Sequence, residues 1–275
     1  MPDDNVTVNA VFDEIEYTIG IPGSSHGSVS APETAHYNDA ITLNVTPEEG
    51  YAVRYVKYND TVILPQNGEY SFRMPPENVT ISAQFDIPKD PVSYLDENGK
   101  QQSVTVYEVL NGSESTLETG WYVLSSDIAY SGRITVLGDV TLILCDNCTL
   151  DAGNGGINVA SGNSLTVYAQ SLTGSDSAGV LNAKAVAEKY SGFGSGCTGT
   201  CGDITISGGT VKAVGGSEGA GIGSGKGGRC GNITITKNVI EVIAIMCENA
   251  QSIGNGHNGS CGTITIDSGA NVIQN

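Results

Sequence analysis

Alternating apolar and polar residues dominate the first third of the chain. Runs such as "AITLNVTP" at 40–47, "YAVRYVKYN" at 51–59 and "NVTISAQF" at 78–85 follow a period of two, and Gly-, Pro- and Asn-rich turns separate them. Successive side chains of a strand point to opposite faces, so this period is typical of half-buried strands. The pattern predicts a small β domain over residues 14–90.

From residue 134 onward, short strand-like pieces follow one another with hardly any helical spacing. Examples are "VTLIL", "SLTVYA" and "GVLNA". Grouped by threes, these pieces give coils of about 23 to 31 residues, the range of a solenoid coil. The segment "KAVAEKY" at 184–190 is a candidate for a short helix or an insertion between coils.

A glycine motif recurs in the last third of the chain. The sequences "GSGCTG", "GSGKGG" and "GNGHNG" begin at Gly194, Gly223 and Gly254, and each precedes a Cys-Gly pair and an Ile-Thr-Ile run. The spacing is that of a dinucleotide-binding loop, but such a loop opens a helix, whereas Ile-Thr-Ile predicts a strand. The Walker pattern also fails, because Ala220 and Gly227 stand where it needs a glycine and a Ser or Thr. We therefore interpret the motif as a structural repeat.

The spacing of these repeats predicts continuous rows of like residues. Cys201, Cys230 and Cys261 recur at intervals of 29 and 31 residues. Two apolar ladders and one outward threonine row are expected: Leu165, Ile204, Ile233 and Ile264; Phe193, Ile222 and Ile253; and Thr205, Thr234 and Thr265. The predicted fold is all-β, with a small β-rich repeat domain followed by a right-handed parallel β-helix, or solenoid, with glycine-rich coils over 134–275.

The remaining segments complete the predicted domain organisation. The opening "MPDDNVTVNAVFD" matches "MPPENVTISAQFD" at 74–86 almost position for position, so residues 1–13 are expected to be the end of a truncated β repeat. Residues 91–133 are expected to be a linker and the N-terminal cap of the solenoid, with Trp121 and Tyr122 covering its first coil. We expect a fragment whose signal sequence and anchor lie outside the chain.

Two segments resemble known bacterial repeats. The residues "TPEEGY" at 46–51 and "SFRMPPENVTISAQF" at 71–85 resemble the divergent internalin-type B repeat, which implies a stalk or spacer module without catalytic residues. Residues 134–275, with "ITISGGTV" and "GAGIGSG", resemble the glycine-rich parallel β-helix repeats of bacterial surface proteins, some of which are suggested to be adhesive or to bind carbohydrate. Both resemblances imply an extracellular or cell-surface location in a bacterium.

The charge balance narrows the class of partner. Asp and Glu number 30 and Lys and Arg 12, which gives a net charge of −18. Nucleic acids and anionic membranes attract positive surfaces, so neither is an expected partner. No stretch approaches the roughly eighteen apolar residues of a membrane span, so we expect no direct membrane insertion by this fragment. The expected partner is a polysaccharide or a host or cell-surface protein.

The cysteines suggest neither a full disulfide framework nor a metal site. Seven cysteines cannot all pair within one chain. Stacked at the strand spacing of about 4.8 Å, the repeat cysteines satisfy the Cα distance of a disulfide, although a ladder of buried thiols is the preferred interpretation. Cys145 and Cys148 have no histidine nearby in the sequence. No metal ion and no cofactor is therefore expected.

Catalysis has little support in the sequence. A glycosidase needs two converging carboxylates, and a lyase of this shape generally needs acidic metal ligands beside a base. The acidic residues of the predicted β-helix are scattered and are expected at turns or in solvent: Asp146, Asp151, Asp203, Glu218 and Asp267. We therefore assign no catalytic residue.

Carbohydrate binding without catalysis is the alternative. Sugars commonly pack on aromatic side chains, so the candidate contacts are Tyr168 and Tyr190, joined by Trp121 and Tyr122. The preferred function is a non-catalytic stalk or adhesin-like surface module. A carbohydrate-binding β-helix comes second, and a polysaccharide lyase or hydrolase ranks last.

Overall fold

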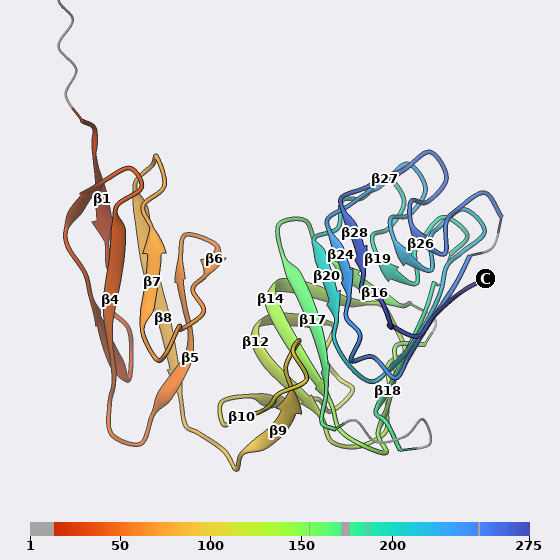
Figure 1. The fold of residues 1–275 in the computed structure, drawn as a ribbon, viewed down its shortest axis with the longest axis horizontal. Coiled ribbons are helices and arrows are strands. Elements are labelled where there is room, and N and C mark those ends of the chain that lie inside the picture. Colours follow the sequence, from red (N-terminus) through yellow and green to blue (C-terminus); the bar gives the residue numbers. More distant parts are fainter. Residues whose placement is uncertain (1–13, 154, 172–176, 186, 247) are drawn as a thin grey trace, which may run out of the picture. The chain divides into compact units, whose positions relative to one another are not determined.

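The computed structural model describes residues 14–153, 155–171, 177–185, 187–246 and 248–275. The chain divides into two compact units, Met1–Asp86 and Ile87–Asn275 (Figure 1). Strands are the regular elements of the described residues, so the prediction of an all-β chain is confirmed. No helix in this part of the chain has the length and apolar character of a membrane span. The predicted truncated repeat at 1–13 lies outside the described residues.

The first unit contains a five-stranded and a three-stranded sheet, in the orders β3-β1-β8-β5-β6 and β2-β4-β7. Its strands are β1 (Glu16–Gly20), β2 (Gly27–Ser30), β3 (Thr34–His36), β4 (Ala40–Pro47), β5 (Ala52–Tyr58), β6 (Thr61–Val62), β7 (Tyr70–Arg73) and β8 (Val79–Asp86). Neighbouring strands are antiparallel except β1 and β8, which pair in parallel. The first and last strands therefore lie side by side.

The predicted alternation places one face of each strand in the core of the first unit. In β4, Ile41 and Leu43 are buried while Thr42 and Asn44 are exposed. The apolar core consists of Ile19, Ala35, Ile41, Leu43, Val56, Ile63, Phe72, Met74, Val79 and Ile81. Removing each large side chain from water contributes roughly 1.5 to 3 kcal/mol to stability.

The second unit is a parallel β-helix preceded by a hairpin. The hairpin consists of β9 (Val92–Leu95) and β10 (Gln101–Val104), which are antiparallel. The strands that follow are β11 (Glu108–Val109), β12 (Thr116–Leu124), β13 (Ile128–Ala129), β14 (Ile134–Leu144), β15 (Thr149–Asp151), β16 (Ile157–Val159), β17 (Ser164–Ala169), β18 (Val180–Lys184), β19 (Phe193–Gly194), β20 (Asp203–Ile206), β21 (Thr210–Val214), β22 (Ile222–Gly223), β23 (Arg229–Cys230), β24 (Ile233–Ile235), β25 (Glu241–Ile245), β26 (Ile253–Gly254), β27 (Ser260–Cys261), β28 (Ile264–Ile266) and β29 (Val272–Gln274).

These strands stack on three faces because each pairs in parallel with its equivalent one coil away. The first face runs β12-β14-β17-β20-β24-β28, the second β13-β15-β18-β21-β25-β29 and the third β14-β16-β19-β22-β26. Figure 1 shows β14, β17, β20, β24 and β28 side by side, coloured from green to blue. The strand β14 takes part in two faces, so the first and third faces form one continuous 11-stranded sheet.

The predicted rows of like residues are confirmed by the strand register. Leu165, Ile204, Ile233 and Ile264 pair in succession, and so do Phe193, Ile222 and Ile253. The members before the last coil are buried, and Ile264 is 40% exposed. Thr205, Thr234 and Thr265 also pair, and the row extends through Thr166 to Thr141. Repetition in the sequence therefore translates directly into the axial order of the stack.

The coils differ from the predicted ones at two places. Parallel pairing already begins with β11 and β12, so part of the segment 91–133, expected to be a linker and cap, is a coil of the stack. The step from Leu165 to Ile204 spans 39 positions, longer than predicted, because Val167 and Val180 lie 13 positions apart whereas their partners Ile206 and Thr210 lie 4 apart. The described residues of "KAVAEKY" after Lys184 form a turn rather than a helix. The connection from Lys184 to Phe193 spans 9 positions, and the equivalent connection from Val214 to Ile222 spans 8, so the segment is an ordinary corner of the stack rather than an insertion.

Candidate functional site

Three aromatic side chains from different strands meet on the outside of the β-helix. The ring centroid of Tyr94 in β9 lies 4.9 Å from that of Trp121 in β12 and 5.1 Å from that of Tyr168 in β17. The rings of Trp121 and Tyr168 are 6.2 Å apart and nearly parallel. All three side chains are half-buried. This aromatic cluster unites two of the predicted sugar contacts, Trp121 and Tyr168, and adds Tyr94.

The hairpin β9–β10 is fastened to the stack beside this cluster. The Tyr168 hydroxyl donates to Oε2 of Glu97 at 3.1 Å. The Asn238 side-chain amide donates to the carbonyl oxygens of Asp96 and Glu97, at 3.2 and 2.8 Å. Asn238 is buried and the two bonds are partly buried, so they hold the tip of the hairpin in place.

Ionisation states follow from these contacts. Burial raises the pKa of Tyr168, and the carboxylate of Glu97 raises it further. Burial likewise raises the pKa of Tyr94. The hydrogen bonds from the Gln102 side chain and the Lys100 amide hold the pKa of Asp96 below its ordinary value. At neutral pH the tyrosine hydroxyls are therefore protonated donors beside an ionised aspartate.

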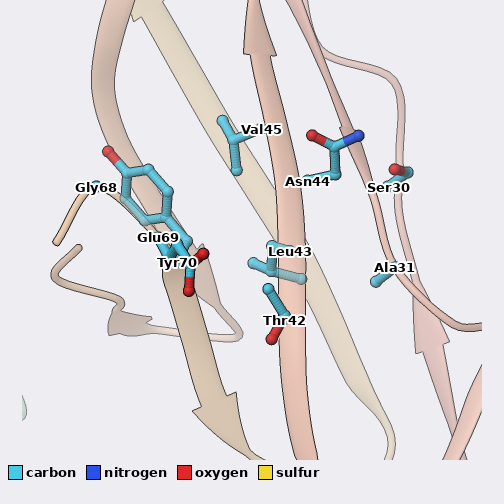
Figure 2. A pocket seen from close by; sticks show the side chains of 9 residues that line it. All are labelled: Ser30, Ala31, Thr42, Leu43, Asn44, Val45, Gly68, Glu69 and Tyr70. Carbon is cyan, nitrogen blue, oxygen red and sulfur yellow. The ribbon is translucent and has the colours of Figure 1, made fainter. Parts of the chain in front are cut away.

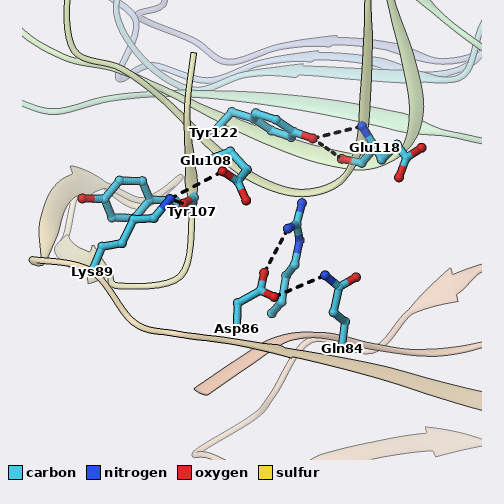
Figure 3. Close-up of polar contacts among 8 residues, drawn as sticks. Gln84, Asp86, Lys89, Tyr107, Glu108, Glu118 and Tyr122 are labelled. Atoms are coloured by element: carbon cyan, nitrogen blue, oxygen red, sulfur yellow. Dashed lines mark hydrogen bonds and ion pairs between the residues drawn. The ribbon is translucent and has the colours of Figure 1, made fainter. Parts of the chain in front are cut away.

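Tyr122 is buried, and its place corrects the prediction that it contacts a sugar. It is 7% exposed, and its hydroxyl donates to the carbonyl oxygen of Glu118 and accepts from the amide of the same residue (Figure 3). Trp121 and Tyr122 are consecutive in β12, so they point to opposite faces of the strand. Trp121 lies outside and Tyr122 packs inside, where it belongs to the core of the stack.

Figure 3 also shows how the segment after the hairpin is held. The Lys89 ammonium donates to the carbonyl oxygen of Tyr107 at 2.5 Å and lies 3.5 Å from a carboxylate oxygen of Glu108. Its Nζ also lies 5.3 Å from the centroid of the Tyr107 ring. These contacts join the start of the second unit to the strand that opens the parallel stack.

Tyr190, the fourth predicted sugar contact, has different neighbours. The guanidinium of Arg133 lies 5.5 Å from its ring centroid, a cation–π arrangement. The same guanidinium donates to four carbonyl oxygens, those of Gly155, Ile157, Ser191 and Gly194, at 2.7 to 3.3 Å. Burial lowers the pKa of Arg133 to about 10, so it stays charged at neutral pH. Tyr190 therefore packs on a half-buried guanidinium that links the chain around β16 and β19.

The glycine loops use their amides to connect coils. In "GSGKGG", the amide of Ser224 donates to Gly254, that of Lys226 to Lys189 and that of Gly227 to His257, at 2.8 to 2.9 Å. At Gly223, where φ is +135°, a Cβ would collide with the carbonyl oxygen of Gly254 in the next coil. A phosphate site needs free amide donors, whereas these amides already donate to carbonyl oxygens of other coils. The glycines of the motif therefore serve the stacking of the coils, as the interpretation as a structural repeat predicts.

The acidic residues considered as catalytic candidates accept hydrogen bonds within the stack. Their donors are the Ser171 hydroxyl for Asp146, the Gly153 amide for Asp151, the Asn232 amide for Asp203, the Lys226 ammonium for Glu218 and the Lys237 amide for Asp267. These bonds place the carboxylates in turns and between coils, as the turn chemistry of Asp suggests. Within the described residues, no group of three or more His, Cys, Asp or Glu side chains is arranged to hold a metal ion.

A shallow pocket of about 470 Å³ lies in the first unit between β2, β4 and β7 (Figure 2). It is lined by Ser30, Ala31, Thr42, Leu43, Asn44, Val45, Gly68, Glu69 and Tyr70. Burial raises the pKa of Tyr70, so its hydroxyl is a neutral donor at physiological pH. The sequence does not predict this pocket, because its lining residues come from separate strands and share no motif.

Comparison with known proteins identifies the first unit. No curated protein and no solved structure matches the chain. Residues 17–88 match the divergent InlB B-repeat domain. The matched residues lie within the segment 14–90 that was predicted to be an internalin-type repeat. Within the first unit, residues 17–88 are therefore similar to the divergent InlB B-repeat, as the sequence predicted, and this family suggests a repeat module of bacterial surface proteins.

Proposed function

We propose that the chain is a non-catalytic stalk or adhesin-like module on the outside of a bacterial cell. The observation that carries this proposal is the use of polar groups along the β-helix. Glycine amides and carboxylates that would serve a catalytic or phosphate site instead bond one coil to the next. A stack built in this way gains length with every coil, which suits a spacer. The B-repeat in the first unit supports a surface location.

The partner in this proposal is a host or cell-surface protein. The net charge of −18 favours a basic protein surface over nucleic acid or an anionic membrane. Recognition would use the outward rows of the stack, because the inward rows are filled by the apolar core.

The full chain bound to beads tests this proposal in two assays. We expect the beads to adhere to immobilised surface proteins, and the soluble chain to release no reducing or unsaturated ends from a panel of polysaccharides. Turnover of any polysaccharide by a folded sample would overturn the non-catalytic assignment. Adhesion to proteins would support the adhesin-like role, and absence of all adhesion would support the spacer role.

The aromatic cluster favours a second function, carbohydrate binding. Trp121 and Tyr168 present nearly parallel rings, and the C–H groups on the face of a sugar can pack on such aromatic side chains. A glycan array with the full chain tests this function. A polysaccharide that binds the wild type and loses affinity with Trp121→Ala, but keeps it with the matched variant Tyr190→Ala, would place sugar recognition at the cluster. Equal loss in both variants, or no loss in either, would contradict a site there.

A further inference from the structure

Three cysteines form a row in successive coils. Cys230 in β23 pairs in register with Cys261 in β27. The amide of Cys201 donates to the carbonyl oxygen of Arg229, and Thr200 and Arg229 form an isolated parallel β-bridge. Cys201 is therefore the equivalent of Cys230 in the preceding coil. The Sγ atoms of Cys201 and Cys230 lie 2.8 Å apart. The sulfur atoms of Cys201 and Cys230 in this cysteine row are thus already in contact.

The geometry of the backbone suits a disulfide between neighbours in this row. Equivalent residues of adjacent parallel strands have Cα atoms about 4.8 Å apart, within the range of about 4.4 to 6.8 Å that a disulfide spans. Cys201 and Cys230 are 2% and 7% exposed and belong to the apolar core of the stack. A bond between them would be protected from water and from reductants.

Access to the row is unequal. Cys261 is half-buried, whereas Cys230 and Cys201 are buried. The hydrogen bond from Cys230 holds the pKa of Cys261 below its ordinary value. Hydrogen bonding to Cys201 and to Cys261, together with burial, raises the pKa of Cys230. The accessible thiol of Cys261 therefore also ionises more readily than that of Cys230, and the thiolate is the nucleophile in disulfide exchange.

We propose that the cysteine row is an oxidisable site in which a disulfide enters at Cys261 and comes to rest between Cys201 and Cys230. The oxidant is a small-molecule disulfide. The Cys261 thiolate attacks one of its sulfur atoms, the S–S bond breaks, and one small thiol leaves with a proton from water.

Two exchange steps then move the bond inward. Cys230 gives up its proton and attacks Sγ of Cys261, which releases the second small thiol. Cys201 next gives up its proton and attacks Sγ of Cys230, and the Cys261 thiolate leaves. In total two protein thiols are oxidised, one small disulfide is reduced to two thiols, and Cys261 is free again.

This inference goes beyond the proposed function and is independent of any ligand. A protein outside the cell meets an oxidising environment, where such a bond persists. The bond would join two successive coils at a corner of the stack, where the backbone beside Cys201 pairs with β23 only through the isolated bridge between Thr200 and Arg229.

The full reduced chain treated with oxidised glutathione tests the proposal. Lys189, Lys212, Arg229 and Lys237 let trypsin place the three cysteines on separate peptides. After acid quenching and alkylation, we expect peptide 190–212 to be joined to peptide 230–237, with fragment spectra placing the bond at Cys201 rather than Cys197. Absence of this crosslink from a folded sample would overturn the proposal, as would a crosslink that stops between Cys230 and Cys261.

Variants test the route. We expect Cys261→Ser to slow formation of the Cys201–Cys230 bond at least about tenfold, because the two thiols left in the row are buried. Cys145→Ser, which alters another buried thiol outside the row, should leave the rate unchanged. An unchanged rate in a folded Cys261→Ser variant would overturn entry at Cys261. If that variant fails to fold, Cys201→Ala serves instead, and it should accumulate the Cys230–Cys261 bond.

Discussion

In the first unit most strands pair with antiparallel neighbours, and β1 and β8 from its two ends lie side by side. In the second unit each strand pairs in parallel with its equivalent one coil away. Contacts in the first unit therefore connect its whole length, whereas contacts in the β-helix connect mainly neighbouring coils. We infer that the first unit unfolds as one cooperative body and that the second has a stability close to a sum over coils.

The turn glycines of the two units also differ in the space that surrounds them. Gly50 and Gly68 in the first unit have positive φ values with open space around them. In the β-helix, the backbone of the next coil leaves no room for a side chain at Gly194 or Gly223. Stacking thus makes a corner glycine a packing requirement as well as a conformational one.

The largest expected effect comes from filling one of these corners. We expect Gly223→Ala to cost more than about 3 kcal/mol, because a strained φ and a clash with the Gly254 carbonyl must both be relieved. The matched variant Gly50→Ala should cost only about 1 kcal/mol, since only its φ is unfavourable. Urea unfolding of both variants measures the difference, and equal costs would contradict the role of stacking.

Core truncation tests cooperativity directly. Ile204 and Ile81 are fully buried in the second and first units, so we expect either change to alanine to cost about 2 to 5 kcal/mol. Amide hydrogen exchange should then rise throughout the first unit in Ile81→Ala. In Ile204→Ala it should rise chiefly in the coils next to β20. The control Thr205→Ala, on the outward side of the same strand, should be nearly neutral. Uniform loosening of the β-helix would argue against additive coils.

A smaller effect is expected where the antiparallel hairpin meets the parallel stack. We expect Asn238→Ala to remove two hydrogen bonds to the hairpin tip, at a cost of about 1 to 2 kcal/mol. Tryptic cleavage after Lys100, in the hairpin turn, should accelerate about 5- to 30-fold. Asn182→Ala, in β18 on the second face, is the matched control and should leave that cleavage unchanged. Equal rates in the two variants would show that Asn238 does not fasten the hairpin.

The smallest effect concerns acid. Burial by itself would raise the pKa of Glu114, but hydrogen bonds from the Tyr130 hydroxyl and from the amides of Asn111 and Gly112 outweigh it and lower the pKa. Stability from this carboxylate is complete above pH 4.5, the ordinary value, and is lost as the pH falls through the lowered folded value. Because the site is partly exposed, we expect less than about 1 kcal/mol.

Urea midpoints measured between neutral and acidic pH test this expectation. Glu114→Gln should flatten the acid dependence of the second unit and leave that of the first unit unchanged. Tyr130→Phe should reproduce part of the effect, because it removes one of the same hydrogen bonds. If the stability of the second unit fell with pH in Glu114→Gln as steeply as in the wild type, other titratable groups would be responsible for the acid dependence.

Much of the fold and part of the site were predictable. Repeated "ITI" segments and cysteines identified the rows and their order, because a residue that recurs once per coil lies above its own copy. Strand alternation alone separates Trp121 from Tyr122, so the prediction that both contact a sugar is wrong for Tyr122. The first coil was harder to predict from the sequence, because a register shift after Glu118 interrupts the alternation of apolar and polar residues in β12.

The sequence by itself determined the strand period, the coil spacing and the identity of the stacked residues, since these depend on neighbours at regular intervals. The tertiary structure alone decided the aromatic cluster, the bonds of Asn238 to the hairpin and the covering of Arg133 by Tyr190. These contacts join segments that are distant in sequence and follow no period. They depend on how far the hairpin and the loops reach across the stack, which the packing of the whole second unit sets.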